Sequence, residues 1–346
     1  MYNLNNSIPK VSVMIITYNH APYIAQAIES VLAQETEYSF EINIIEDCST
    51  DGTQDIIRHY KQQYPDKINA YLNPVNIGTN SPPLQKVFYE GFKYFRGEYI
   101  AILEGDDYWG STNKLQKQVK FLEENPTYAA TAHNTIKIYE DRSKEPHRFL
   151  YWEGTKSIHT IHDFVAMTSF FHTSSVIYRN VLNGIAPKQF SSKWSCDIFN
   201  TMAHVQHGDL YYFDEDMSFY RAHKGSNFSN MSAVQGRLFN IHGLRRYNRW
   251  LGYRYCKGFA FTLRRLCFDL LEQGKQGTLP QLPFKERMKC HAIGWFYTSV
   301  YLFFCIIPPL QPSVFWYGEP IIGSKGRTRA LMWLKKVYTS THQKID

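Results

Sequence analysis

The chain has 346 residues, of which 44% are hydrophobic and 20% are charged. These values are ordinary for a globular protein, and the length suits one large domain or two smaller ones. The six cysteines have no CxxC or other metal-ligand spacing, which excludes a cysteine-rich metal module. Residues 1–10 are polar, so we expect no secretory signal and reduced thiols in the cytosol.

Charge is distributed unevenly along the chain. Residues 1–230 carry 20 Lys and Arg against 26 Asp and Glu, a net charge of −6, whereas residues 231–346 carry 18 against 5, a net charge of +13. The asymmetry predicts an acidic catalytic part and a basic part that faces something anionic. Nucleic acid and the anionic leaflet of a membrane are the two alternatives. Because the basic part has no recognisable nucleic-acid motif, we expect no nucleic-acid partner.

Strands and helices alternate along the first 140 residues or so. Val11–Thr17 is a continuous β-branched run, which is typical of a buried parallel strand. The pattern then predicts the following elements in chain order: a helix at 24–32, a strand at 41–47, a helix at 53–64, a strand at 67–72, a helix at 84–96, a strand at 98–103, a helix at 114–124 and a strand at 129–139. This order predicts an α/β fold with a doubly wound, mostly parallel sheet that is Rossmann-like.

The pattern loosens after residue 139. Short strands are expected at 174–178 and 217–222, and a helix at 197–207. From about residue 231 the chain is basic and helical in character. The apolar run 292–310 is shorter than the roughly 20 apolar residues that a spanning helix needs, so we expect an interfacial or packed segment. Residues 328–338 read as a short amphipathic basic helix.

Acidic residues follow two of the expected strands. Glu104, Asp106 and Asp107 come directly after an apolar run, and clustered acids repel one another unless a cation lies among them. A solvated acidic turn is the alternative. Asp47 ends the strand at 41–47. Because open α/β sheets bind ligands at the carboxyl ends of their strands, these two ends predict a site for a nucleotide and its metal.

Other polar side chains have two readings each. Asp47 either accepts a hydrogen bond from a base or ribose or caps the next helix. Asp197 is the first residue of an expected apolar helix. It is either a general base or an acid that interacts favourably with the helix dipole. Arg221 and His223 lie on one side of a strand and either reach a diphosphate or its metal or are two exposed polar residues. The 13 histidines as a set carry no signal.

Six short motifs occur in a fixed order. They are the opening strand with its Tyr-Asn ending (11–19), an Ile-x-Ser-Val-Leu-x-Gln helix (23–34), the acidic strand end 46–53, an Asn-x-Gly loop (76–78), the strand with its acids (97–107) and Tyr-Arg-x-His (220–223). Each motif alone is weak, but the ordered set resembles the inverting glycosyltransferases of family 2, which have the GT-A fold. The resemblance covers residue 11 to about 229 and is greatest to bacterial members that build capsule, lipopolysaccharide or cell-wall glycans.

The resemblance implies a donor site. Asp47 would contact the nucleobase, with Thr17 and Tyr18 lining that pocket. Asp106, together with Asp107, would reach the metal and the diphosphate. Glu104 stands at the first acid of an Asp-x-Asp motif, where it would contact ribose or metal. Glutamate is one methylene longer than the aspartate that the motif usually has there.

The resemblance also implies a catalytic base and a metal. Asp197 would remove the proton of the acceptor hydroxyl, and burial near Trp194 would raise its pKa. Arg221 would bind the nucleotide-sugar and His223 would bind the metal, which would be Mn²⁺ or Mg²⁺. The donor would be a nucleotide-sugar, in the first place a UDP-sugar, and the acceptor a hydroxyl of a glycan or lipid-linked molecule.

The resemblance leads to an expected domain organisation. Residues 1–230 would form the GT-A catalytic domain. Residues 231–346 would form a helical extension that contacts the membrane peripherally, forms a homo-oligomer or packs internally. The protein would then work in the cytoplasm at the inner face of the cell membrane.

Two other functions fit parts of the sequence. A sugar-nucleotide nucleotidyltransferase would also use a doubly wound sheet with metal-binding acids. It would need a Gly-rich, basic loop after the first strand, where this chain has residues 18–22 without Gly, Lys or Arg. A non-enzymatic basic adaptor for membrane or nucleic acid would use only residues 231–346.

Overall fold

The computed structural model describes residues 8–78, 85–149, 156–185, 187, 197–223 and 232–306. The chain divides into two compact units, Met1–Met231 and Ser232–Asp346. The expected helix at 328–338, the end of the apolar run at 307–310 and Trp194 lie outside the described residues.

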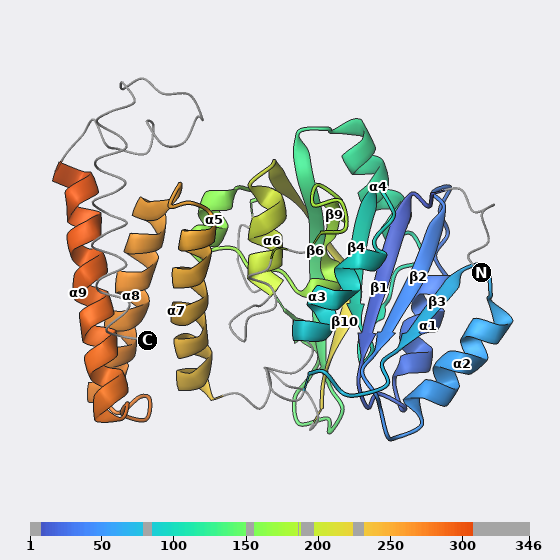
Figure 1. The fold of residues 1–346 in the computed structure, drawn as a ribbon, viewed down its shortest axis with the longest axis horizontal. Helices are drawn as coiled ribbons and strands as arrows, with labels where there is room; N and C mark the ends of the chain where they lie inside the picture. The colour runs from blue at the N-terminus through green and yellow to red at the C-terminus, as the bar shows by residue number, and fades with distance from the viewer. Residues whose placement is uncertain are drawn as a thin grey trace. The chain divides into compact units, whose positions relative to one another are not determined.

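The first unit contains a ten-stranded sheet with helices packed beside it (Figure 1). Its strands are β1 (Val11–Thr17), β2 (Phe40–Glu46), β3 (Ile68–Leu72), β4 (Tyr99–Glu104), β5 (Tyr108–Trp109), β6 (Tyr128–Tyr139), β7 (His147–Arg148), β8 (Ile158–His159), β9 (Ile177–Arg179) and β10 (Asp209–Ala222). The order across the sheet is β3-β2-β1-β4-β9-β6-β10-β5, while β7 pairs with β6 and β8 with β10.

Most long strands of this sheet run parallel. β1 pairs in parallel with β2 and β4, β2 with β3, and β6 with β10. The three-residue β9 lies between β4 and β6 and is antiparallel to both. The sequence predicted a strand close to this position but not its insertion into the middle of the sheet. The mostly parallel α/β architecture is confirmed.

Within the described segments of the first unit, six α-helices and two 3-10 helices accompany the sheet. They are α1 (Ile24–Leu32), α2 (Thr53–Gln63), α3 (Gln85–Gly91), η1 (Phe92–Tyr94), α4 (Lys114–Glu124), α5 (Ile161–Val165), η2 (Thr173–Ser175) and α6 (Asp197–Val205). The helix expected at 84–96 is therefore a short α3 followed by η1. At the end of α3, a Cβ on Gly91 would lie 2.4 Å from the Sδ atom of Met14 on β1, so a larger residue there would displace that side chain.

The described part of the second unit, residues 232–306, contains three long helices, α7 (Ala233–Trp250), α8 (Cys256–Lys275) and α9 (Phe284–Ile306). A capping box begins α7, because Ser232 Oγ accepts from the Gln235 amide at 3.3 Å and Gln235 Oε1 accepts from the Ser232 amide at 3.0 Å. α9 runs alongside α8 and includes the first part of the apolar run (Figure 1). Among the described residues, none of the helices combines the length and the hydropathy that crossing a membrane requires.

A lysine side chain lies in the core of the first unit. Lys114 on α4 is fully buried, and its Nζ has no hydrogen-bond partner among the described residues. Nζ lies 4.3 Å from the ring centroid of Trp109, so a cation–π contact is its visible compensation. Burial lowers the pKa of Lys114 well below its usual value. The folded state therefore binds this proton less readily than the unfolded state.

We expect Lys114→Met to stabilise the protein at pH 7 by at least about 1 kcal/mol, because the unfolded lysine is charged there and folding must neutralise or bury that charge. A lowered lysine pKa makes wild-type stability rise with pH up to about 10.5. The advantage of the variant should therefore shrink between pH 7 and 9.5 in urea unfolding. Lys120→Met, on the exposed side of the same helix, is the control and should change little. An unchanged or lower stability of Lys114→Met at pH 7 would contradict the argument.

Candidate active site

The carboxyl ends of three neighbouring strands meet at one edge of the sheet. Thr17 on β1 lies opposite Glu46 on β2, and Ile16 lies opposite Glu104 on β4. The pairing continues one residue further on each side, since the Asp47 amide donates to Thr17 O at 3.1 Å and the Gly105 amide donates to Ile16 O at 2.8 Å. The two acidic strand ends thus lie at one edge of the sheet, on either side of the end of β1.

Asp47 is 1% exposed and holds the loop that follows β3. Its carboxylate accepts from Asn73 Nδ2 at 3.0 Å and from the amides of Ile77 and Gly78, both at 2.9 Å. Asn76 of the Asn-x-Gly motif also donates a hydrogen bond from its Nδ2 to Asp47 O at 3.0 Å. The side chain of Asp47 therefore fixes the position of the loop that follows β3. A contact to a nucleobase stays a prediction.

Thr17 is the last residue of β1, and Tyr18 comes directly after it. Thr17 is fully buried, and its hydroxyl has no hydrogen-bond partner among the described residues. A Cβ on Gly105 would lie 2.6 Å from that hydroxyl, so the glycine lets the strand ends approach closely. Tyr18 is half-buried. That Tyr18 lines a nucleobase pocket stays a prediction.

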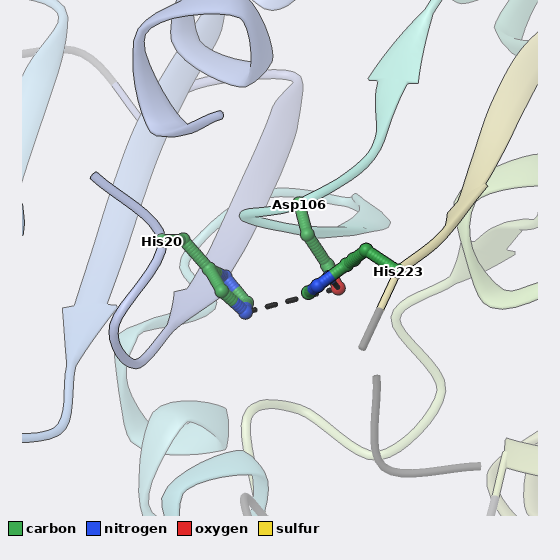
Figure 2. A group of neighbouring side chains, drawn as sticks. All are labelled: His20, Asp106 and His223. Atoms are coloured by element: carbon green, nitrogen blue, oxygen red, sulfur yellow. Dashed lines mark hydrogen bonds and ion pairs between the residues drawn. The ribbon is translucent and has the colours of Figure 1, made fainter. Parts of the chain in front are cut away.

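Asp106 is the centre of a first cluster (Figure 2). Its Oδ2 lies 3.0 Å from His223 Nε2 and 3.7 Å from His20 Nε2. Burial alone would raise the pKa of Asp106, but the hydrogen bond from His223 and the charges of the two histidines hold it below its usual value. The three ligand atoms lie within 4.8 Å of one another. A carboxylate and two imidazoles at this spacing could together hold a divalent metal ion.

Arg221 links the end of β10 to the acidic turn, which comprises residues 104–107. Its amide donates to Asp107 Oδ1 at 2.9 Å and its Nε donates to Asp106 O at 3.0 Å. Its guanidinium also donates to Gln26 Oε1 at 2.7 Å and lies over the Tyr23 ring, 4.9 Å from the centroid. The side chain is thus held at the rim of the first cluster. It brings a permanent positive charge to the place where a diphosphate is expected.

A second cluster also uses acids of this turn. It comprises Glu104, Asp107 and His172, whose ligand atoms also lie within 4.8 Å of one another. Burial, and then the charges of Asp197 and Asp106, raise the pKa of Glu104 to about 8. Burial and the charges of the other two acids also raise the pKa of Asp107 well above its usual value. Burial lowers the pKa of His172 to about 4.

Asp197 begins α6 and comes within electrostatic reach of Glu104. Burial raises the pKa of Asp197 above the ordinary aspartate value. The side chain of Thr173, which is 3% exposed, lowers the pKa of both acids and so lies beside them. A carboxylate with a raised pKa is a better proton acceptor near neutral pH than an ordinary one.

The structure gathers most of the predicted side chains around the acidic turn. Those near Asp106 or Glu104 are Asp107, Asp197, Arg221 and His223. Sequence reasoning missed His20 and His172. His20 follows the Tyr-Asn ending of β1, which gives a local signal, whereas His172 stands in a loop without any recognisable pattern.

The chain matches the family model "Glycosyl transferase family 2" over residues 12–185. This match covers half of the chain. The chain belongs to glycosyl transferase family 2. Membership agrees with the family that the ordered motifs predicted, and the region matched includes both acidic strand ends.

Two bacterial proteins are similar to parts of this family 2 chain. An uncharacterized protein of Mycobacterium tuberculosis is 34% identical over 220 residues, which are 62% of this chain and 59% of that protein. The match therefore spans less than two thirds of the relative. A Bacillus subtilis protein, TuaG, named for a glycosyltransferase role in teichuronic acid biosynthesis, is 36% identical over 121 residues, 35% of this chain and 45% of TuaG.

A solved structure supports the fold of this family 2 chain. The crystal structure of S. aureus TarS residues 1–349 in complex with UDP-GlcNAc aligns with a TM-score of 0.51 and 16% sequence identity. The alignment covers 84% of this chain and 89% of TarS 1–349. The predicted GT-A fold is thereby confirmed.

Proposed function

We propose that the protein transfers a sugar, with inversion at the anomeric carbon, from a nucleotide-diphosphate sugar to a hydroxyl group of a glycan or lipid-linked acceptor. The proposed setting is the synthesis of a bacterial surface polysaccharide, which the match to TuaG supports. The observation that carries the proposal is the convergence of Asp106, His223 and Arg221 beside Glu104 and Asp197. One group of side chains suits a diphosphate and its metal, and the other suits an acceptor hydroxyl.

The donor would lie along the ends of β1, β2 and β4. UDP-sugars are the first donors to test, because family resemblance assigns the base to Asp47 and because the similarly folded TarS holds UDP-GlcNAc. Asp106, His223 and His20 would hold the metal, and Arg221 would add a positive charge. A bound Mn²⁺ or Mg²⁺ supplies a charge that stabilises the departing diphosphate.

Asp197 would act on the acceptor. Its buried carboxylate accepts the proton as the hydroxyl oxygen forms a bond to the anomeric carbon. The bond from that carbon to the diphosphate oxygen breaks on the opposite side of the sugar, and the nucleoside diphosphate leaves with the bonding electrons. The raised pKa of Asp197 brings the proton acceptor closer to neutral pH.

The structure disfavours the nucleotidyltransferase alternative. Such an enzyme uses backbone amides of the loop after the first strand to hold a triphosphate. Here the amides of Asn19, His20 and Ala21 already donate to Ser49 Oγ at 2.8 Å, Thr53 Oγ1 at 3.0 Å and Asp51 Oδ2 at 2.9 Å. These amides are therefore already bonded to side chains of the loop after β2 and the start of α2.

The second unit is proposed to contact an anionic membrane surface. Phe284, Met288, Trp295 and Leu302 on α9 are 69%, 51%, 64% and 48% exposed. Their spacing of four or seven residues places them on one side of the helix. Residues 231–346 also carry the net charge of +13, and aromatic side chains beside basic ones suit a lipid headgroup region. This would bring the enzyme to lipid-linked acceptors at the inner face of the cell membrane.

Asp197→Asn should reduce sugar transfer by about 10²–10⁴-fold, because general-base catalysis is lost while size and shape are kept. Donor affinity should change by less than about threefold, since the proposed donor contacts lie at other residues. Turnover with radiolabelled UDP-sugar and calorimetric donor binding measure the two effects. Asp55→Asn, which alters an 83% exposed acid in the first turn of α2, is the matched control. Equal turnover of Asp197→Asn and wild type would reject the assignment.

Asp106→Ala should abolish the Mn²⁺-dependent part of donor binding, because it removes the carboxylate that contacts both histidines. A thermal-shift screen of nucleotide-sugars with and without Mn²⁺ measures this and identifies the donor. Wild type should show a larger shift with donor and Mn²⁺ together than the sum of the separate shifts. Asp66→Ala, an exposed acid before β3, is the control. A Mn²⁺-dependent donor shift that survives Asp106→Ala would contradict the metal assignment.

The full chain should float with vesicles that contain about one third phosphatidylglycerol and less well with pure phosphatidylcholine, because the basic second unit is attracted to anionic lipid. Trp295→Glu should reduce the floated fraction several-fold. Tyr64→Glu changes a 42% exposed aromatic residue of the first unit and should have no effect. If wild type stays at the bottom of the gradient with anionic vesicles, the membrane contact is wrong.

A further inference from the structure

One face of the strands β6, β7 and β10 carries aromatic and basic side chains that the proposed function leaves unused. Lys137 on β6 lies opposite Tyr220 on β10 and opposite His147 on β7, so the three side chains project from the same face of the sheet. Phe149 joins this face, because its amide donates to Thr135 O at 2.7 Å, two residues before Lys137. The strand pairing thus gathers a cation and several rings on one surface.

Four rings form an aromatic strip that ends at the acidic turn; they belong to Phe149, Phe170, His172 and Tyr220. The ring centroids of Phe149 and Phe170 are 5.8 Å apart, and the Phe149 centroid lies 5.3 Å from that of His172. The His172 ring lies 4.6 Å from the Tyr220 ring, and its Nε2 is 3.7 Å from Asp107 Oδ2. At the other end of the strip, Phe170 is 37% exposed. The aromatic strip therefore leads from solvent to the proposed active site.

The segment that carries His172 also lies beside the proposed base. The next residue, Thr173, has its side chain next to Asp197. Ser174 Oγ donates to Ser218 Oγ at 3.0 Å, which fixes the segment to β10. A molecule that lies on the aromatic strip would therefore come close to Asp197, which the proposed function assigns to the acceptor.

Lys137 adds a positive charge to this face. Its Nζ lies 5.2 Å from the ring centroids of both Tyr139 and Tyr220, and Lys144 Nζ lies 5.5 Å from that of Tyr139. Aromatic rings hold an ammonium group in place without neutralising its charge. Neither lysine forms an ion pair with an acid of the described residues. The charge of Lys137 is therefore available to an anionic group of a ligand.

We propose that this face binds the acceptor and that the acceptor is an acidic glycan. The inference rests on the proposed function, because it takes Asp197 to be the group that the acceptor hydroxyl must reach. The C–H groups on one side of a sugar ring pack on the negative face of an aromatic ring, which the aromatic strip offers. A carboxylate or phosphate group on the same glycan would pair with Lys137. A neutral glycan would leave that charge without a partner.

The test measures binding of oligosaccharides to the full chain by calorimetry, without a donor. The probes are tetragalacturonate, which carries carboxylates, a phosphorylated mannose oligosaccharide, and neutral maltotetraose. Wild type should bind at least one acidic probe about tenfold more tightly than maltotetraose, because a charge-assisted contact is added. The preference should fall as salt is added. The acidic probe that binds more tightly identifies the anionic group.

Variants separate the charge from the rings. Lys137→Met should lose the preference for acidic probes, because it removes the charge and keeps much of the length, whereas Lys137→Arg should retain it. Phe170→Ala should weaken the binding of acidic and neutral probes alike, by about threefold to tenfold. Lys67→Met removes another lysine whose Nζ lies over a ring, 4.1 Å from the Phe40 centroid, and Tyr64→Ala removes a 42% exposed ring. Both are controls and should bind like wild type.

Absence of binding, or equal affinity of wild type for acidic and neutral probes, would overturn the proposal. An undiminished preference in Lys137→Met, shown to be folded by circular dichroism, would do so too. The outcome is separable from that of the proposed function. Charge-dependent binding of an acidic oligosaccharide without transfer from any nucleotide-sugar would support the binding face and reject sugar transfer. Transfer to neutral glycans at equal rates in wild type and Lys137→Met would do the reverse.

Discussion

The in-register parallel pairing of β1 with β2 and β4 is the constraint on which the site depends. Parallel strands end at the same edge, so each acid that follows an apolar strand is brought to a common place. The arrangement is electrostatically costly because carboxylates gather where little water remains. His223 and Arg221, which lie far from these acids in the sequence, offset part of that repulsion through a hydrogen bond to Asp106 and a positive charge near Asp107.

Much of the fold could be predicted because its elements carry local signals. The bounds of Val11–Thr17 and Lys114–Glu124 agree with the structure, since a continuous β-branched run and a clear apolar periodicity each specify one conformation. A short strand was also predicted at 174–178, near β9, but its position in the sheet was not. The strand β9 has three residues, and its place between β4 and β6 comes from pairing with strands far away in sequence. Pairing of that kind cannot be deduced from local pattern.

The same distinction applies to the candidate site. Glu104, Asp106 and Asp107 could be found because acids directly after a buried run form a local pattern. His20 and His172 could not be identified in this way, because their contacts are made with residues 86 and 65 positions away. Asp197 was correctly placed at the start of a helix. Its closeness to Glu104 depends on the packing of α6, which the sequence does not disclose.

The turn itself explains why consecutive acids have different environments. Asp106 faces two histidines and has a lowered pKa, whereas Asp107 faces other acids and has a raised one. Gly105 permits this division, since a Cβ there would lie 2.6 Å from Thr17 Oγ1 and 3.0 Å from His20 Nδ1. The chain can therefore pass close to β1 and give the neighbouring carboxylates of Asp106 and Asp107 different partners. A Glu-Gly-Asp-Asp sequence is thus able to serve two groups of ligands, because a single small residue sets the path of the backbone between them.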